Sequence, residues 1–206
     1  MAPFTYKIQD ILNRFADSER LELYFDQLEV WNSKINLVSR ETVRDDWRRL
    51  AAESLVPLAI LEDDASLGGL KSSWRLYLDI GSGGGFPAVP LALSGRIGRT
   101  VCLDSVGKKA GALNEMLHEL TVDGEARQVR LEEWKTVERF DLVTMRLVAL
   151  DIRLWKAIHR LVASDGLFIY YSHPKFDFKP SRFHVKQRTF TLDDSTVVKQ
   201  LTYVFR

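Results

Sequence analysis

The first third of the chain carries apolar side chains at intervals of three and four positions, the spacing of one helix face. Asp17 and Ser18, residue types that cap helix starts, stand at the beginning of the first such stretch, which covers 18–32. A second stretch covers 43–61. The inward-facing positions are Leu21, Tyr24, Phe25, Leu28 and Trp31 in the first stretch, and Trp47, Leu50, Ala51, Ser54, Leu58 and Leu61 in the second. We predict an N-terminal helical cap over residues 1–66.

Beyond Leu67, Gly68 and Gly69 the pattern changes to short apolar runs separated by helical stretches. The runs cover 76–80, 100–103, 127–130, 140–144 and 167–171, and the clearest helical stretches between them cover 108–120 and 151–162. Alternation of this kind is typical of a parallel sheet flanked by helices.

Two extended stretches rich in β-branched and aromatic residues follow, 182–192 and 197–205, with Asp193, Asp194 and Ser195 between them. They predict a closing antiparallel hairpin. The predicted fold class is a doubly wound α/β domain with a mostly parallel, seven-stranded sheet. Residues 1–206 then form a single domain, with 67–206 as its α/β core.

Composition agrees with this fold class. Of 206 residues, 46% are hydrophobic and 28% are charged, the balance of a globular protein and not of a disordered one. The sequence has no apolar run near the roughly 18 residues that span a bilayer, and its first thirty residues lack a secretory signal pattern. We expect a cytoplasmic protein without a membrane partner. The single cysteine, Cys102, lies in an apolar run and is expected to pack in a strand.

The net charge of +1 shows that the protein is not a general polycation, so only local clusters can favour nucleic acid. From 171 onward seven basic residues stand against three acidic ones: Lys175, Lys179, Arg182, Lys186, Arg188, Lys199 and Arg206 against Asp177, Asp193 and Asp194. A second cluster comprises Lys34, Arg40, Arg44, Arg48 and Arg49. Either cluster could contact phosphates, although a solvated surface has the same composition.

The clearest local motif is the glycine-rich stretch that follows the first predicted strand, Leu78-Asp79-Ile80-Gly81-Ser82-Gly83-Gly84-Gly85-Phe86-Pro87. Glycine lets the backbone turn sharply and approach a ligand closely. A dinucleotide fingerprint needs glycine at its sixth position, where this chain has Phe86. The G-x-G-x-G pattern of Gly81, Gly83 and Gly85 instead suits a cofactor without phosphate, such as S-adenosylmethionine. The Asp79 carboxylate can then meet the cationic methionyl end of that cofactor.

Asp104 ends the next predicted strand, 23 positions after Gly81. An acidic side chain at the carboxyl edge of a parallel sheet can bind both ribose hydroxyls of a nucleoside. This spacing supports a nucleoside site, but it serves a methyltransferase and a dehydrogenase alike.

The sequence contains no pattern typical of a metal site or of a hydrolase. The four histidines show no ligand spacing with cysteine or carboxylate residues, and no G-x-S-x-G motif occurs. We therefore predict no metal site.

Several segments together resemble the bacterial glucose-inhibited division protein B family. They include Trp31-Asn32-Ser33-Lys34-Ile35-Asn36-Leu37, the glycine loop with its continuation Ala88-Val89-Pro90-Leu91-Ala92, Leu103-Asp104-Ser105 with Lys108-Lys109, Arg130-Leu131-Glu132-Glu133, and Phe140-Asp141 leading to Arg146. The W-N-x-x-x-N-L stretch and the two prolines after the glycines are the most specific of these. The resemblance covers most of the chain.

The resemblance implies an S-adenosylmethionine-dependent methyltransferase that modifies guanine N7 in small-subunit (16S) ribosomal RNA. It implies cofactor contacts for Gly81 and Phe86, and an adenine-flanking position for Leu131 and Glu132. Arg146 matches an arginine after the fourth core strand, where its guanidinium could hold a cofactor carboxylate or an RNA phosphate. The expected partner is ribosomal RNA or the small subunit, and the protein is expected to be a monomer.

Guanine N7 has a lone pair and no proton, so methylation needs in-line placement and no general base. We therefore predict no catalytic base. Trp134, Tyr170 and Tyr171 are candidates for stacking on an unpaired base, while aromatic residues near strand ends also serve as core.

Departures from the family pattern fall at positions expected to face the substrate. Leu50 replaces a histidine, Met145 and Leu147 flank Arg146 where the family has serine and alanine, and Ser172-His173 replace lysine and glycine. Arg49 and Lys175 are the remaining candidates for RNA contact, Lys175 as a substitute for the missing lysine. These departures leave open a non-catalytic RNA-binding or ribosome-assembly protein, or a methyltransferase with another substrate.

Overall fold

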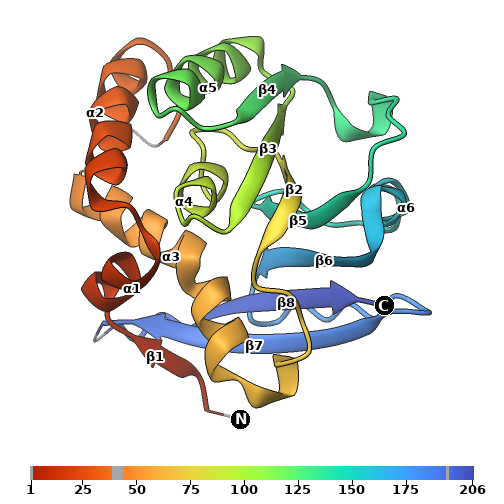
Figure 1. Cartoon of the computed structure of the whole chain (residues 1–206). Helices are drawn as coiled ribbons and strands as arrows, with labels where there is room; N and C mark the ends of the chain where they lie inside the picture. Colours follow the sequence, from red (N-terminus) through yellow and green to blue (C-terminus); the bar gives the residue numbers. More distant parts are fainter. Residues whose placement is uncertain (1, 39–43, 194) are drawn as a thin grey trace.

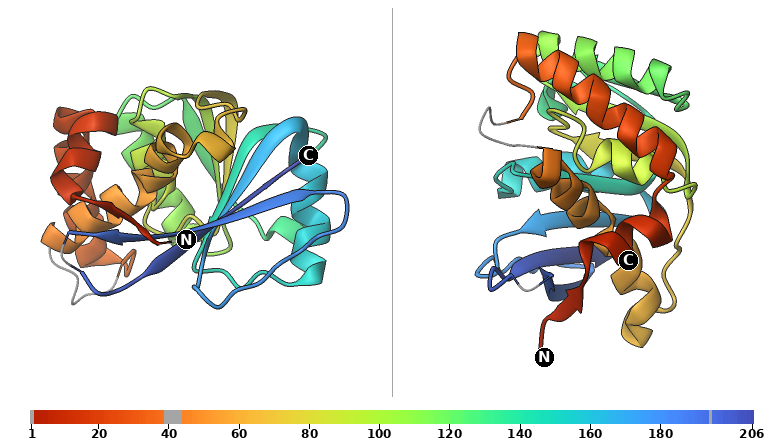
Figure 2. Two further views of the ribbon diagram at one scale, coloured as in Figure 1. Left: turned by 90° about the horizontal axis from the view of Figure 1, so that it is seen from below. Right: turned by 90° about the vertical axis from the view of Figure 1, so that its left-hand side faces the viewer.

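The strands of the core alternate side chains between two helical layers, as expected for parallel strands buried on both faces. A computed structural model describes residues 2–38, 44–193 and 195–206; Arg40, Val43 and Asp194, which entered the sequence predictions, lie outside these ranges. On β2 (Trp74–Ile80), Tyr77 packs toward one layer and Leu78 toward the other. Figure 1 and the turned views of Figure 2 show the sheet between these layers.

The sheet has the strand order β1-β7-β8-β6-β5-β2-β3-β4. Its parallel centre comprises β2, β3 (Ile97–Asp104), β4 (Gly124–Gln128), β5 (Phe140–Arg146) and β6 (Val162–Ser172). The antiparallel pair β7 (His184–Leu192) and β8 (Lys199–Phe205) extends it beyond β6. The doubly wound α/β class and the closing hairpin are therefore confirmed.

The predicted number of seven strands was wrong, because the described residues form a sheet of eight strands. The additional strand, β1 (Phe4–Tyr6), pairs in parallel with β7 and sets Phe4 opposite Phe190. Three residues are too few to show the alternation that indicates a strand. The N-terminal region is therefore more than a helical cap, since it supplies an edge strand to the core sheet.

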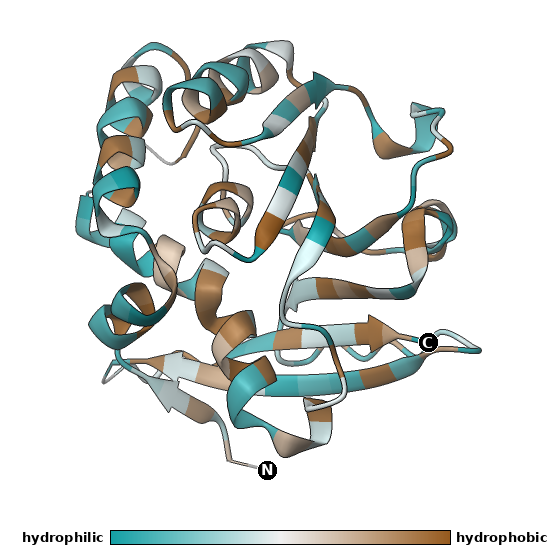
Figure 3. Ribbon diagram, in the orientation of Figure 1, coloured by the Kyte–Doolittle hydropathy of each residue, from teal (hydrophilic) through white to brown (hydrophobic). Residues whose placement is uncertain are grey.

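One helical layer contains α1 (Ile8–Phe15), α2 (Ser18–Lys34), α3 (Arg44–Asp63), α4 (Ala88–Ala92) and α5 (Gly107–Glu119). The sequence predicted α2, α3 and α5, and Asp17 caps α2 by accepting from the Arg20 backbone N–H. It missed α1, although Ile8, Ile11, Leu12 and Phe15 have helical spacing. Residues 51–61 of α3 are all buried, and Figure 3 shows mostly hydrophobic residues over the middle turns of this helix.

The opposite face of the sheet is covered by α6 (Ile152–Leu161) and by a 3-10 turn, Leu131–Glu133. Asp151 caps α6 by accepting from the backbone N–H groups of Arg153 and Leu154. Cys102 is fully buried in β3, as the sequence predicted. In the described part of the chain, no helix combines the length and apolar character needed to cross a membrane.

Candidate functional site

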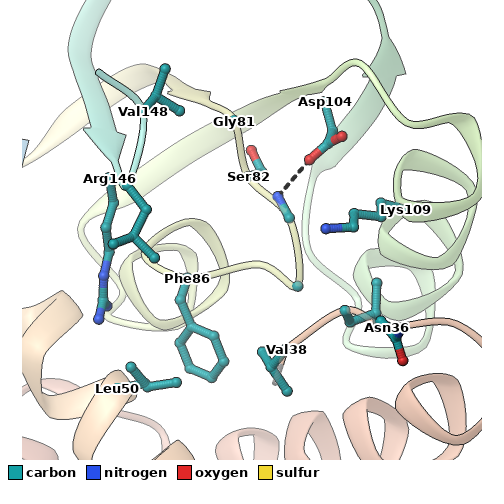
Figure 4. A pocket seen from close by; sticks show the side chains of 14 residues that line it. Asn36, Val38, Leu50, Gly81, Ser82, Phe86, Asp104, Lys109, Arg146 and Val148 are labelled. Carbon is teal, nitrogen blue, oxygen red and sulfur yellow. Dashed lines mark hydrogen bonds between the residues drawn. The ribbon is translucent and has the colours of Figure 1, made fainter. Parts of the chain in front are cut away.

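The main cavity lies where the strand order reverses direction. Strand β2 has β3 on one side and β5 on the other, and ligands of doubly wound folds bind at the carboxyl ends of strands at this point. The cavity has a volume of about 630 Å³, within the roughly 300–1,000 Å³ typical of small-molecule sites. Figure 4 shows Asp104 and Arg146 on opposite sides of the glycine loop.

The glycine loop lines this cavity, and two of its glycines combine a positive φ with no room for a Cβ. Gly81 has φ +74°, and a Cβ there would lie 2.5 Å from Val148 Cγ2. Gly85 has φ +102°, and a Cβ there would lie 2.8 Å from Val89 Cγ2. L-residues rarely adopt such φ values. At both positions glycine is therefore required by the packing of the protein itself.

Asp104 holds the loop and faces the cavity. Its Oδ2 accepts from the Gly83 backbone N–H at 2.9 Å, and its Oδ1 accepts from the Val106 backbone N–H at 2.8 Å. A carboxylate has about four lone-pair sites, so each oxygen can accept a further hydrogen bond. This partly buried carboxylate on the cavity wall fits the ribose hydroxyls of a nucleoside.

Asp79 lies in β2, two positions before Gly81, and is not among the residues that line the cavity. It is 1% exposed, and its Oδ1 accepts from Thr144 Oγ1 at 2.5 Å. Its Oδ2 has no hydrogen-bond partner among the described residues. Burial raises the pKa of Asp79 to about 6. A buried carboxylate oxygen without a partner is costly, and a nearby cationic group would relieve that cost.

Arg146 stands between the main cavity and a second cavity of about 390 Å³. Its Nη2 donates to Glu53 Oε2 at 2.7 Å, and its guanidinium lies 5.8 Å from the Tyr171 ring centre. The side chains of Arg146 and Glu53 are only 10% and 3% exposed. Arg146 Nη1 is buried without a hydrogen-bond partner in the described part of the chain. The guanidinium is therefore fixed by a buried carboxylate and retains donor capacity.

The sequence analysis missed Glu53, which pairs with both Arg146 and Lys199. It comes from α3, whereas its partners come from β5 and β8, so no local motif contains the three residues. One feature of the sequence could have indicated Glu53. Glu53 is a single carboxylate in the apolar part of α3, and such residues are almost never fully buried unless they are paired.

Most of the positions that depart from the family pattern line the second cavity. Leu147, Ser172 and His173 line it, and Leu147 also lines the main cavity together with Leu50. Leu147 is 93% exposed with φ +57°. Met145 differs, because it is fully buried in the core.

The N-terminal segment closes the main cavity, which gives the W-N-x-x-x-N-L stretch a physical role. Asn32 Oδ1 accepts from the backbone N–H groups of Leu37 and Val38 at 2.9 and 3.0 Å. This turn brings Asn36, Leu37 and Val38 to the cavity wall. Tyr24 fixes the same region by donating to the Gly84 carbonyl at 2.7 Å.

Five residues of the predicted cofactor and RNA sites line the main cavity: Gly81, Gly83, Phe86, Asp104 and Arg146. Lys109 and Ser82 also line it and had not been assigned a role. Gly85 belongs to the loop but does not line the cavity, and it packs against Val89 and Tyr24.

Other predicted site residues lie away from the main cavity. Leu131 is buried in the core, and Glu132 is exposed beside it. Arg49 pairs with Asp193 at 3.9 Å and lines a smaller neighbouring cavity. Lys175 is exposed and follows the residues that border the second cavity.

The three aromatic candidates for stacking also have different positions. Tyr171 lines the second cavity and donates to the Ser54 carbonyl at 2.7 Å. Tyr170 is largely buried and donates to the Val148 carbonyl. Trp134 packs near Phe140, with ring centres 5.9 Å apart. Only Tyr171 is therefore placed beside a cavity of the site.

The residues of the main cavity fit S-adenosylmethionine. Gly81, Gly83 and Gly84 line it without side chains, and Asp104 offers acceptors for hydroxyl groups. Outside the lining, Asp79 Oδ2 lacks a partner among the described residues. Within the described ranges, no group of three or more His, Cys, Asp or Glu residues is arranged to hold a metal ion.

Solved structures of methyltransferases share this fold. A putative O-methyltransferase from Klebsiella pneumoniae matches with a TM-score of 0.58 and 13% identity over 88% of this chain and 89% of that chain. Magnesium protoporphyrin IX methyltransferase from Synechocystis PCC 6803, solved with bound S-adenosylmethionine, matches with a TM-score of 0.54 and 19% identity over 88% and 91%. These likenesses confirm the fold.

Sequence comparison is more specific. Ribosomal RNA small subunit methyltransferase G from Rhodospirillum rubrum is 33% identical over 153 residues, which cover 73% of this chain and 71% of that protein. The protein of the same name from Brucella canis is 36% identical over 138 residues, 64% of this chain and 59% of its own length. The family model described as rRNA small subunit methyltransferase G matches residues 17–199. The chain therefore belongs to this methyltransferase family, as its motifs predicted.

Proposed function

We propose that this protein transfers a methyl group from S-adenosylmethionine to N7 of a guanine in small-subunit ribosomal RNA. The observation that carries the proposal is the pair of adjoining cavities that share Arg146 and Leu147. One is built around a glycine loop and Asp104, and the other offers space beside it. The names of the curated relatives support ribosomal RNA as the substrate.

The cofactor would be held by the backbone of the glycine loop, with Asp104 accepting from the ribose hydroxyls. Leu50, Val38 and Phe86 supply apolar walls. When bound, S-adenosylmethionine supplies an electrophilic methyl group on a sulfonium centre. Asp79, which is buried behind the lining of the cavity, would offset the cationic end of this ligand.

The residues of the second cavity would receive and orient the target base. Tyr171 and His173 line its wall, and Arg146 has donor capacity left for an acceptor atom of the base. Because N7 carries no proton, these residues need only position the base, so we assign no general base. We further propose a cytoplasmic monomer that acts on ribosomal RNA or on the small subunit.

A second candidate is a non-catalytic protein of ribosome assembly that keeps the cofactor cavity. The observation that favours it is that Leu50, Leu147, Ser172 and His173, which all depart from the family pattern, line the two cavities. A methyltransferase with another substrate would also accommodate these changes.

Methyl transfer from labelled S-adenosylmethionine separates these functions. The acceptors are isolated small subunits and deproteinised small-subunit RNA, and the modified position is mapped by chain cleavage at N7-methylguanine. The proposal expects label at one guanine N7. Cofactor binding without transfer to either acceptor would favour the second candidate, and label elsewhere would favour another substrate atom.

A further inference from the structure

A third cavity lies apart from the two described above, on the face of the sheet that α6 covers. It is a groove of about 940 Å³ between α6 and the segment that precedes β7. We call it the α6 groove and define it by Ile152, Trp155, Lys156 and His159 of α6, residues 178–183, and Arg206. None of these residues lines either cavity of the proposed active site.

Basic side chains surround the α6 groove. Lys156, Lys179, Arg182 and Arg206 are all exposed, and His159 is half-buried. None of the described residues that line the groove is acidic. Lys179 pairs with Asp177 at 2.8 Å, where both side chains are largely exposed. The local charge is therefore strongly positive in a protein whose net charge is only +1.

The wall of the groove is aromatic. Trp155 packs edge to face against Phe178 and Phe183, with ring centres 5.2 and 5.1 Å apart. Trp155 is buried and supports the other two rings, which are half-buried. The Arg206 guanidinium lies 5.2 Å from the centre of the Phe183 ring. Cations combined with aromatic rings are the usual surface for single-stranded nucleic acid, where phosphates meet the cations and bases stack on the rings.

The groove is also continuous along the chain with the proposed active site. His173 and Pro174 border the second cavity, and the same segment reaches the groove at Phe178. From the other side, Val148 lines the main cavity and Ile152 begins α6. A strand whose target base enters the second cavity could therefore continue over the groove.

We propose that the α6 groove binds the ribosomal RNA strand beside the target nucleotide, through contacts of Lys156 and Arg182 with phosphates. This inference rests on the proposed function, because it extends the substrate contact of that site. Three basic residues of the C-terminal segment, Lys179, Arg182 and Arg206, then contact RNA away from the cofactor cavity.

The test compares Lys156→Gln/Arg182→Gln with a matched pair, Lys7→Gln/Arg75→Gln, in the full chain. Lys7 and Arg75 are exposed, and Arg75 lies at the amino end of β2, away from the cavities. Three quantities are measured: calorimetric binding of S-adenosylmethionine, the salt dependence of binding to deproteinised small-subunit RNA and to isolated small subunits, and the KM and kcat of methyl transfer.

The groove variant is expected to bind the cofactor normally and RNA on the order of tenfold more weakly, with a salt slope shallower by about 0.7 per lost phosphate contact. The KM for RNA should rise while kcat stays unchanged, because the groove does not touch the reacting atoms. Equal RNA affinity and slope in the two variants would overturn the proposal. Weaker binding to assembled subunits alone would overturn it in favour of a protein partner. Failure of the wild-type chain to bind either acceptor would instead reject the proposed function itself, and this proposal with it.

Discussion

The two cavities of the proposed active site are built by different means. The main cavity depends on backbone geometry, with left-handed glycines and a carboxylate that receives two backbone N–H groups. The second depends on side chains from distant elements, joined by Glu53, which pairs with the buried Arg146 and with the partly exposed Lys199. Backbone geometry tolerates few residue types, whereas side chains can be exchanged. This difference explains why the departures from the family pattern gather at the second cavity and its border.

The largest expected effect concerns the main cavity. Gly81→Val would combine a β-branched residue at φ +74° with a Cβ 2.5 Å from Val148 Cγ2. We expect cofactor binding to fall on the order of a hundredfold or more, as measured by calorimetry. Gly111→Ala is the matched control, since a Cβ at this exposed position of α5 meets nothing within 4 Å. It should leave cofactor binding intact and raise helix stability by roughly 0.5–1 kcal/mol.

Glu53→Gln should have the next largest effect, because it leaves the buried Arg146 without its carboxylate partner. We expect the free energy of unfolding to fall by about 3 kcal/mol in denaturant titrations. Glu22 is a matched control, because it also pairs with two arginines, Arg44 and Arg48, but its side chain is 40% exposed. Glu22→Gln should lower the free energy of unfolding by no more than about 1 kcal/mol. Equal losses in the two variants would show that the Glu53 pairs behave as surface pairs.

Asp79 gives the stability of the protein a dependence on pH. Its pKa is raised from 3.8 to about 6 by burial, so the folded state holds this proton more tightly than the unfolded state. The stabilising contribution of the protonated group is complete below about pH 4 and is lost as pH rises through about 6. Relative to Asp79→Asn, the free energy of unfolding of the wild-type protein should fall by roughly 3 kcal/mol over this range. A constant difference between the two proteins from pH 4 to pH 7.5 would contradict the account.

The glycine loop and Asp104 could be predicted because their residues are close in sequence and their types are dictated by backbone geometry. The helices α2, α3 and α5 were predicted for a similar reason, their regular spacing of apolar side chains. The contact of Glu53 with Lys199 joins positions in α3 and β8, so only the fold reveals it. Glu132 was assigned by resemblance alone, and Lys175 was assigned as a basic tail residue that could replace a lysine of the family. Neither lines a cavity of the site.

Leu147 is expected to show the smallest effect. It is 93% exposed at φ +57°, so its side chain gains little from burial while its backbone is strained. Asn adopts this conformation more readily, and Leu147→Asn should raise the free energy of unfolding by about 0.5–1 kcal/mol. Thermal unfolding measures the change. A loss of stability would mean that the leucine makes apolar contacts at the cavity border.

The most direct test of the central claim, that the glycine-loop cavity binds the cofactor, is a calorimetric titration of S-adenosylmethionine into the wild-type protein and Asp104→Asn. Asp151→Asn is the matched control, because Asp151 also accepts from two backbone N–H groups but lies at the start of α6. The account predicts one bound cofactor per chain for the wild type and the control, and affinity weaker by about tenfold or more for Asp104→Asn. Absence of wild-type binding, or equal affinity in all three proteins, would contradict it.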